Sequence, residues 1–158
     1  MTLISLVLGT SLTVAATERV TISLVLAGTL GWSFVPMLQL LTGLLLIRGG
    51  RPGHVAALEP YFDTHWPWSL WILTSSAVLL MIPTTRAFGV WAALTAAVPL
   101  IWTIRLLIGC CRDVLHLSNR QARRRVALHQ IVTYAITLAY VNAAVALWPR
   151  VVGLLPWL

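Results

Sequence analysis

The longest stretch without a charged residue constrains this sequence most. It runs from Val20 to Ile47, which is 28 residues, and most of its side chains are apolar. About 20 consecutive apolar residues suffice for a helix to cross the hydrocarbon core of a bilayer. A helix is also the simplest way for such a segment to satisfy its own backbone hydrogen bonds in lipid. The stretch therefore predicts a transmembrane helix.

The composition supports a membrane protein over a soluble one. Hydrophobic residues make up 59% of the 158-residue chain and charged residues only 9%. A soluble domain is usually about 45–50% apolar and about 25% charged. Too little polar surface is left to cover a water-soluble enzyme or DNA-binding domain, and the apolar content excludes intrinsic disorder.

Three further apolar stretches predict spanning helices. They cover residues 67–82, 87–108 and 126–147, after the first span at 20–47. The second stretch is short, and Pro67 suits the first turn of its helix. Pro36 and Pro99 lie inside two of the spans and are expected to kink them. We predict an all-α integral membrane protein, a bundle of four transmembrane helices that forms one domain over residues 1–158.

The first 16 residues are also apolar, and several interpretations of them stay open. They are short for a span. Val14, Ala15 and Ala16 are typical of a signal-peptidase site, but the basic residues of a signal peptide do not precede them. We expect a short interfacial or re-entrant helix here. A fifth span and an uncleaved signal-like segment are the alternatives.

The basic residues indicate orientation in a membrane. All 11 are arginines, against four acids, and they flank the apolar stretches, so we expect no nucleic-acid partner. The loops at 48–66 and 105–125 hold eight arginines, and the opposite side holds three. Since positive loops face the cytoplasm, these two loops are predicted to be cytoplasmic and the C-terminus to lie outside. The use of arginine without lysine indicates a GC-rich bacterial genome, and we expect the protein in a bacterial inner membrane.

The arginine-rich connection is expected to be helical from residue 105 to residue 125, extending the third span into the cytoplasm. Its last six residues carry a cluster of four arginines, which we expect to contact anionic lipid headgroups. An acidic protein partner is the alternative. The cluster consists of Arg120, Arg123, Arg124 and Arg125.

Small residues recur at every fourth position of two spans. Such stripes let membrane helices approach closely, either within one chain or between subunits. The stripe of the first span is Ser23, Ala27 and Gly31, and that of the fourth is Ala135, Ala139 and Ala143. The chain is also rich in tryptophan, with eight residues, which we expect to serve packing and lipid contact.

Acidic and histidine side chains near the predicted inner interface form the strongest candidate site. Carboxylates and imidazoles are suitable donors for Zn, Mn or Fe, yet neither an HExxH motif nor a repeated ExxH motif is present. Pairing with the neighbouring arginines explains these residues more simply, so we predict no metal ion. His65 and His129 are conceivable haem ligands, but both lie at the interface, and we expect no cofactor. The weak metal candidates are Glu59, Asp63, His65, Asp113 and His116.

The function expected from these features is non-catalytic. No GxSxG motif or P-loop is present, and the two cysteines are adjacent, which supports no disulfide framework. We expect an accessory or scaffold subunit that packs against other membrane helices or forms a homo-oligomer. A component of an oligomeric transporter or channel and a metal-dependent membrane enzyme are the alternatives.

Overall fold

The described part of the chain is helical nearly throughout. The computed structural model describes residues 7, 9–11, 21–47, 54–81 and 85–154, and no strand occurs among them. The all-α prediction is confirmed. The helices are α2 (Ile22–Trp32), α3 (Phe34–Ile47), the 3-10 turn η1 (His54–Ala57), α4 (Leu58–Asp63), α5 (Trp66–Met81), α6 (Thr85–Thr95), α7 (Ala97–Asp113) and α8 (Asn119–Leu154).

Three helical stretches are long and apolar enough to cross a membrane. They are Gly28–Ile47, Arg86–Asp113 and Asn119–Ala144. Helix α5 is apolar as well but has only 16 residues. By length and composition the protein is therefore a membrane protein with at least these three candidate spans in its described part.

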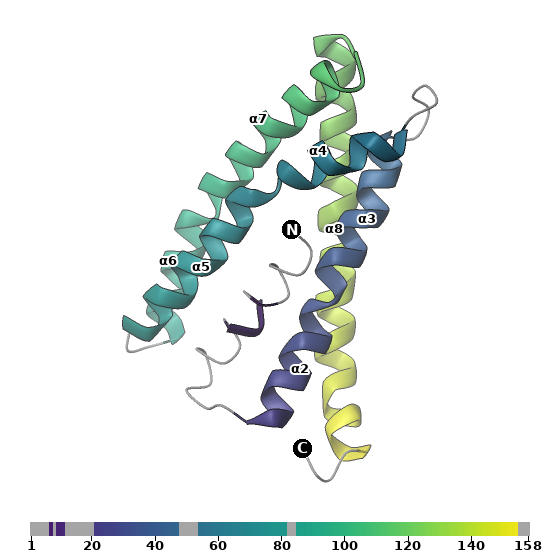
Figure 1. Ribbon diagram of the computed structural model, residues 1–158. Coiled ribbons are helices and arrows are strands. Elements are labelled where there is room, and N and C mark those ends of the chain that lie inside the picture. Colours follow the sequence, from purple (N-terminus) through teal and green to yellow (C-terminus); the bar gives the residue numbers. More distant parts are fainter. Residues whose placement is uncertain (1–6, 8, 12–20, 48–53, 82–84, 155–158) are drawn as a thin grey trace.

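The helices form two pairs that meet at one end (Figure 1). Helix α3 packs along α8, and α5 packs along α7 and α6. The short helix α4 lies across the end where α7 connects to α8, and it contacts both α3 and α7. Away from this end the two pairs diverge. The core lies where the pairs meet and consists of Leu46, Tyr61, Leu107, Cys111, Ala122 and Val126.

Two helix breaks follow from prolines. Helix α2 ends at Trp32 and α6 ends at Thr95, in each case four residues before a proline, Pro36 or Pro99. Proline has no N–H to donate to the carbonyl four residues earlier, and its ring crowds that carbonyl. Helix α3 or α7 resumes after one residue, so each break is a local bend within one apolar stretch.

The expected continuous helix from 105 to 125 is wrong. Helix α7 ends at Asp113 and α8 begins at Asn119. In the connection His116 has φ 51°, a left-handed conformation that stops a helix. Ser118 then starts the next helix, because its N–H and hydroxyl donate to Gln121 Oε1 at 3.1 and 3.0 Å while Gln121 N–H donates back to Ser118 Oγ at 3.4 Å. This reciprocal pair is a capping box.

The C-terminal helix is longer than the sequence predicted, and the prediction for the N-terminal segment stays untested. Helix α8 continues to Leu154, past the predicted end at 147 and through Pro149. A proline inside a helix can bend it without ending it. The N-terminal residues 1–16 lie mostly outside the described residues. Gly9 is described, and a Cβ there would collide with the Trp32 ring, so this point of the chain touches the end of α2.

Candidate functional site

A group of buried polar side chains lies where α4 crosses between α3 and α8. Tyr61 of α4 is 0% exposed. Its hydroxyl lies 3.0 Å from Thr42 Oγ1 of α3 and 3.0 Å from His129 Nε2 of α8. One tyrosine hydroxyl therefore joins three helices. We call Thr42, Tyr61, His65 and His129 the tyrosine cluster.

The donor and the acceptor of each hydrogen bond between Thr42, Tyr61 and His129 can be assigned from the geometry. The Thr42 hydroxyl lies 2.7 Å from Leu38 O and donates to it. A hydroxyl carries one proton, so Thr42 accepts from Tyr61, and Tyr61 accepts the Nε2–H of His129. In the neutral imidazole, the Nδ1 atom of His129 then carries a lone pair and no proton. That atom is buried and has no hydrogen-bond partner.

His65 completes the tyrosine cluster from the α4–α5 turn. Its Nδ1 lies 3.1 Å from Tyr61 O and 3.1 Å from Thr64 Oγ1. Thr64 donates its own proton to Tyr61 O at 2.7 Å, so the His65 Nδ1–H is the donor to both oxygens. The ring of Tyr61 packs edge-to-face on His65 and on His129, with centroids 4.8 and 5.7 Å apart.

Burial keeps the side chains of Tyr61 and His65 uncharged. It raises the pKa of Tyr61 to about 12, although the hydrogen bond with Thr42 acts in the opposite direction. It lowers the pKa of His65 to about 4. Near neutral pH the cluster thus holds a protonated phenol and a neutral imidazole, which suits a hydrogen-bonded joint between helices.

Arg125 behaves differently from the rest of the predicted arginine cluster. Its Nη1–H donates to Leu46 O at 3.0 Å, near the C-terminal end of α3. The carbonyls there have no partner within the helix and carry partial negative charge, which a cation stabilises. Arg125 is half-buried, whereas Arg120, Arg123 and Arg124 are exposed. This separate role was not predicted, because the four arginines are neighbours in the sequence and only the packing of α8 against α3 distinguishes Arg125.

A cavity of about 310 Å³ lies between α3 and α8 beside the tyrosine cluster. Its walls are mainly apolar, and three polar side chains reach it from the two helices. The lining residues are Thr42, Leu45, Leu46, Arg125, Leu128, His129 and Val132.

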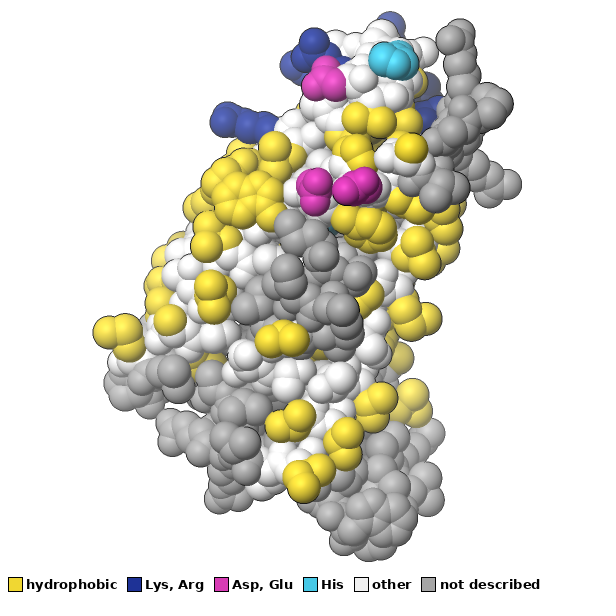
Figure 2. Space-filling model, viewed as in Figure 1, with side chains coloured by type: hydrophobic (Ala, Val, Ile, Leu, Met, Phe, Trp, Pro, Cys, Tyr) yellow, Lys and Arg dark blue, Asp and Glu magenta, His cyan; other side chains and the backbone are white. Residues whose placement is uncertain are grey.

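The predicted metal candidates are dispersed. Glu59, Asp63, Asp113 and His116 are all exposed, and only His65 enters the tyrosine cluster. Figure 2 shows acidic side chains at two separate places on the molecule. Within the described ranges, no group of three His, Cys, Asp or Glu side chains could hold a metal ion. Exposed carboxylates keep their hydration, so nothing forces them to share a partner.

The small-residue stripe of α8 faces away from its neighbour. Ala135, Ala139 and Ala143 are exposed. The face of α8 that meets α3 carries Tyr140 instead, whose ring stacks on Phe34 with centroids 3.9 Å apart. Whether this stripe contacts another helix stays a prediction.

In the first span, only Gly31 of the stripe can be described. Gly31 is exposed, and a Cβ there would meet nothing within 4 Å. Its carbonyl accepts the Tyr140 hydroxyl at 2.8 Å. The side chains of Ser23 and Ala27 lie outside the described part of the structure.

Comparison with known proteins assigns no family to this arrangement. No family model matches the chain, and no curated protein or solved structure is significantly similar to it. Function must therefore be argued from the geometry.

Proposed function

We propose that this protein is a non-catalytic accessory or scaffold subunit whose helix α8 packs against a helix of another membrane subunit or of a second copy. The supporting observation is the exposed stripe of Ala135, Ala139 and Ala143 on a spanning helix. Small side chains allow close backbone approach, and packing is the main force between helices in lipid.

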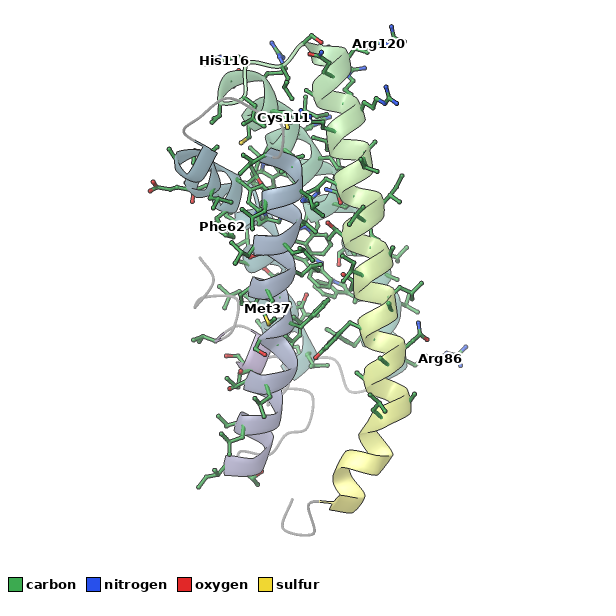
Figure 3. All side chains as sticks on the ribbon, turned by 90° about the vertical axis from the view of Figure 1, so that its right-hand side faces the viewer. Met37, Phe62, Arg86, Cys111, His116 and Arg120 are labelled. Atoms are coloured by element: carbon green, nitrogen blue, oxygen red, sulfur yellow. The ribbon has the colours of Figure 1, made fainter. Side chains whose placement is uncertain are left out.

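Two features of α8 favour this face as the contact surface. In the most apolar 18-residue part of its span, Asn119–Ala144, only 11% is buried within the chain. Its large aromatic Tyr140 is already engaged with α3, on a different side from the alanines. Figure 3 shows α3 along one side of α8. A second helix can therefore approach the alanine face without disturbing the α3–α8 pair.

In this proposal the chain crosses the membrane four times, with α5 as the fourth span. Helix α5 runs from the end of the molecule that carries α4 toward the opposite end, alongside α6 and α7 (Figure 1). Its 16 residues rise about 24 Å, which is less than the roughly 30 Å of a hydrocarbon core. Local thinning of the bilayer accommodates such a mismatch at modest cost.

The charged end of the molecule is assigned to the cytoplasm of a bacterial inner membrane. Arg120 and His116 lie at this end and Arg86 lies toward the other, as labelled in Figure 3. The exposed Arg120, Arg123 and Arg124 then lie near anionic headgroups. The arginine imbalance read from the sequence supports this orientation.

Crosslinking in native membranes tests the contact directly. A photo-reactive amino acid at position 139 should give a covalent adduct, because the proposal places a partner helix against this residue. The same probe at Ala144, which is also exposed but lies outside the stripe, is the matched control. An adduct of twice the chain mass identifies a second copy, and another protein-sized increase identifies a different subunit. A gain of one lipid mass alone would contradict the proposal.

Ala139→Leu should weaken this adduct-forming assembly by on the order of 1 kcal/mol or more, because an isobutyl group blocks close approach. Stability of the isolated chain in detergent should stay unchanged, since Ala139 is exposed. Equal crosslinking at 139 and 144, or full assembly of Ala139→Leu, would contradict the proposal.

A further inference from the structure

Three helices carry buried polar atoms that lack a partner near the point where the two helix pairs begin to diverge. Within the part of the chain that the structure describes, the four unpaired atoms are Gln39 Oε1 of α3, Thr103 Oγ1 of α7, and His129 Nδ1 and Thr133 Oγ1 of α8. We call these four residues the polar layer. Thr103 is 0% exposed and His129 is 6% exposed. Leaving such atoms unpaired inside a protein is unfavourable.

The members on α7 and α8 lie at the same depth. Thr103 is ten residues before the end of α7, and His129 is ten residues after the start of α8. Both are therefore about 15 Å from the connection between the two helices, which pack against each other. Thr133 lies one turn farther along α8. Leu107, one turn nearer to the connection on α7, already belongs to the apolar core.

The member on α3 lies at the level of Thr133. Nearer to α4, Thr42 and His129 are joined through one tyrosine hydroxyl. Farther from α4, a stacked ring pair holds α3 against α8. Gln39 and Thr133 lie between these two contacts on the two packed helices. The polar layer is therefore a single zone of the molecule, directly beyond the core.

The two threonines of the polar layer lack a bond that other threonines make within their own helices. The hydroxyls of Thr42, Thr95 and Thr137 each donate to the carbonyl four residues earlier. This bond satisfies a hydroxyl without any partner helix. The hydroxyls of Thr103 and Thr133 make no hydrogen bond in the described structure, so they are left for a partner outside their helices.

Water suits this zone chemically but cannot reach it in the present arrangement. His129 Nδ1 and Gln39 Oε1 are acceptors, whereas the two hydroxyls can donate and accept. A water molecule donates two hydrogen bonds and accepts two, and buried waters typically bind such groups. All four atoms are closed to solvent, so water reaches them only if the helices move.

The fold permits such a movement on one side of the polar layer. The core packs the helix pairs together at the end that carries α4, and the pairs diverge away from it (Figure 1). We infer that α7 and α8 separate on the side away from α4 and admit water to the polar layer, so that the closed arrangement is one of two states. The core around Tyr61 stays packed and acts as the hinge. The alanine face of α8 takes no part in this movement, which is independent of the proposed function.

Cysteine accessibility in permeabilised cells tests the opening. The full chain with Cys110→Ser and Cys111→Ala would carry Thr103→Cys or Thr133→Cys. A small water-soluble methanethiosulfonate modifies thiols that water reaches, so both positions should react. Leu107→Cys is the matched control, because Leu107 is equally buried but lies in the hinge. It should react at least about tenfold more slowly, since local opening spares the packed core.

A valine variant tests the polar layer without a thiol at position 103. Thr103→Val keeps the shape of the side chain and removes its hydroxyl. It should slow the labelling of Thr133→Cys about fivefold or more, because opening then satisfies one polar group fewer. Thr137→Val is the matched control and should leave this rate unchanged, since the Thr137 hydroxyl is already paired within α8.

Three results would overturn the inference. Unreactive thiols at positions 103 and 133, while exposed Arg86→Cys reacts, would show that the polar layer stays closed and that its side chains find partners by repacking. Equal rates at 103 and 107 would mean that the whole core opens rather than one side of it. Equal effects of Thr103→Val and Thr137→Val would mean that the unpaired hydroxyl does not drive the opening.

Discussion

At the scale of single residues, Tyr61 can pack against α3 because residue 43 is glycine. A Cβ at Gly43 would lie 2.6 Å from Cε1 and 2.8 Å from Cδ1 of the tyrosine ring. Gly43→Ala should therefore displace the ring and strain the hydrogen bonds to Thr42 and His129. Overpacking of this kind costs about 1–3 kcal/mol, which thermal unfolding in detergent would measure as a lower Tm.

Gly31→Ala is the matched control for this prediction. It lies in the same apolar stretch, but a Cβ there has open space. Because alanine favours helices by up to about 1 kcal/mol over glycine, this variant should be as stable as the parent or slightly more so. Equal destabilisation by the two substitutions would show that Tyr61 is not packed as described.

The pH dependence of stability should report on His65. Its pKa is lowered from 6.5 to about 4 by burial. Between these values the unfolded chain binds a proton that the folded chain excludes, so stability is complete above pH 6.5 and falls as the pH drops toward 4. His65→Gln should flatten this part of the profile.

His116→Gln serves as the control for the pH experiment. His116 is exposed, so its removal should leave the profile between pH 4 and 6.5 as it is in the parent protein. A parent profile that does not decline in this range would contradict the burial of the His65 imidazole.

From the sequence, His65 could be identified as a candidate site residue, but the residues that surround it could not. Tyr61 lies in a six-residue helix next to a proline, and such a short segment has no periodicity that could mark a buried face. Its partners Thr42 and His129 are 19 and 68 residues away along the chain. Only the packing of α4 against two other helices brings them together.

At the scale of helices, the junction between α7 and α8 rests on the Ser118–Gln121 capping box. Ser118→Ala should destabilise the protein by about 1 kcal/mol, because the first N–H groups of α8 lose their acceptor. Gln121→Ala should act similarly, and the double variant should lose less than the sum, since both remove one reciprocal interaction. Denaturation in detergent checks this.

Arg120→Ala tests whether the effect is specific to the cap. Arg120 lies in the same turn and is exposed, so its replacement should change the free energy of unfolding by less than about 0.5 kcal/mol. Additive losses in the Ser118 and Gln121 variants, or an equal loss in Arg120→Ala, would contradict the reciprocal cap.

This junction also shows how local signals can be missed. The apolar runs predicted the helices well, because length and composition dominate in lipid, and the positions of Pro36 and Pro99 predicted the bends. The Ser-x-x-Gln pattern at 118–121 is present in the sequence, but the prediction of one helix over 105–125 did not use it. The left-handed conformation of His116 has no composition cue comparable to glycine.

At the scale of the whole molecule, two helix pairs are joined mainly at the end that carries α4. The all-helical architecture could be predicted, whereas the pairing of α3 with α8 and of α5 with α7 depends on surfaces that no single stretch reveals. The central claim is that α5 crosses the membrane, since this places Glu59, which precedes α5, and Arg86, which follows it, on opposite sides.

Labelling with a membrane-impermeant maleimide tests this claim most directly. Glu59→Cys and Arg86→Cys, both at exposed positions on either side of α5, would be introduced with Cys110→Ser and Cys111→Ala, because the native pair is half-buried and buried. In intact cells, we predict labelling at position 86, and labelling at position 59 only after permeabilisation. Labelling of both positions from the same side would mean that α5 does not cross the membrane and would contradict the four-span arrangement.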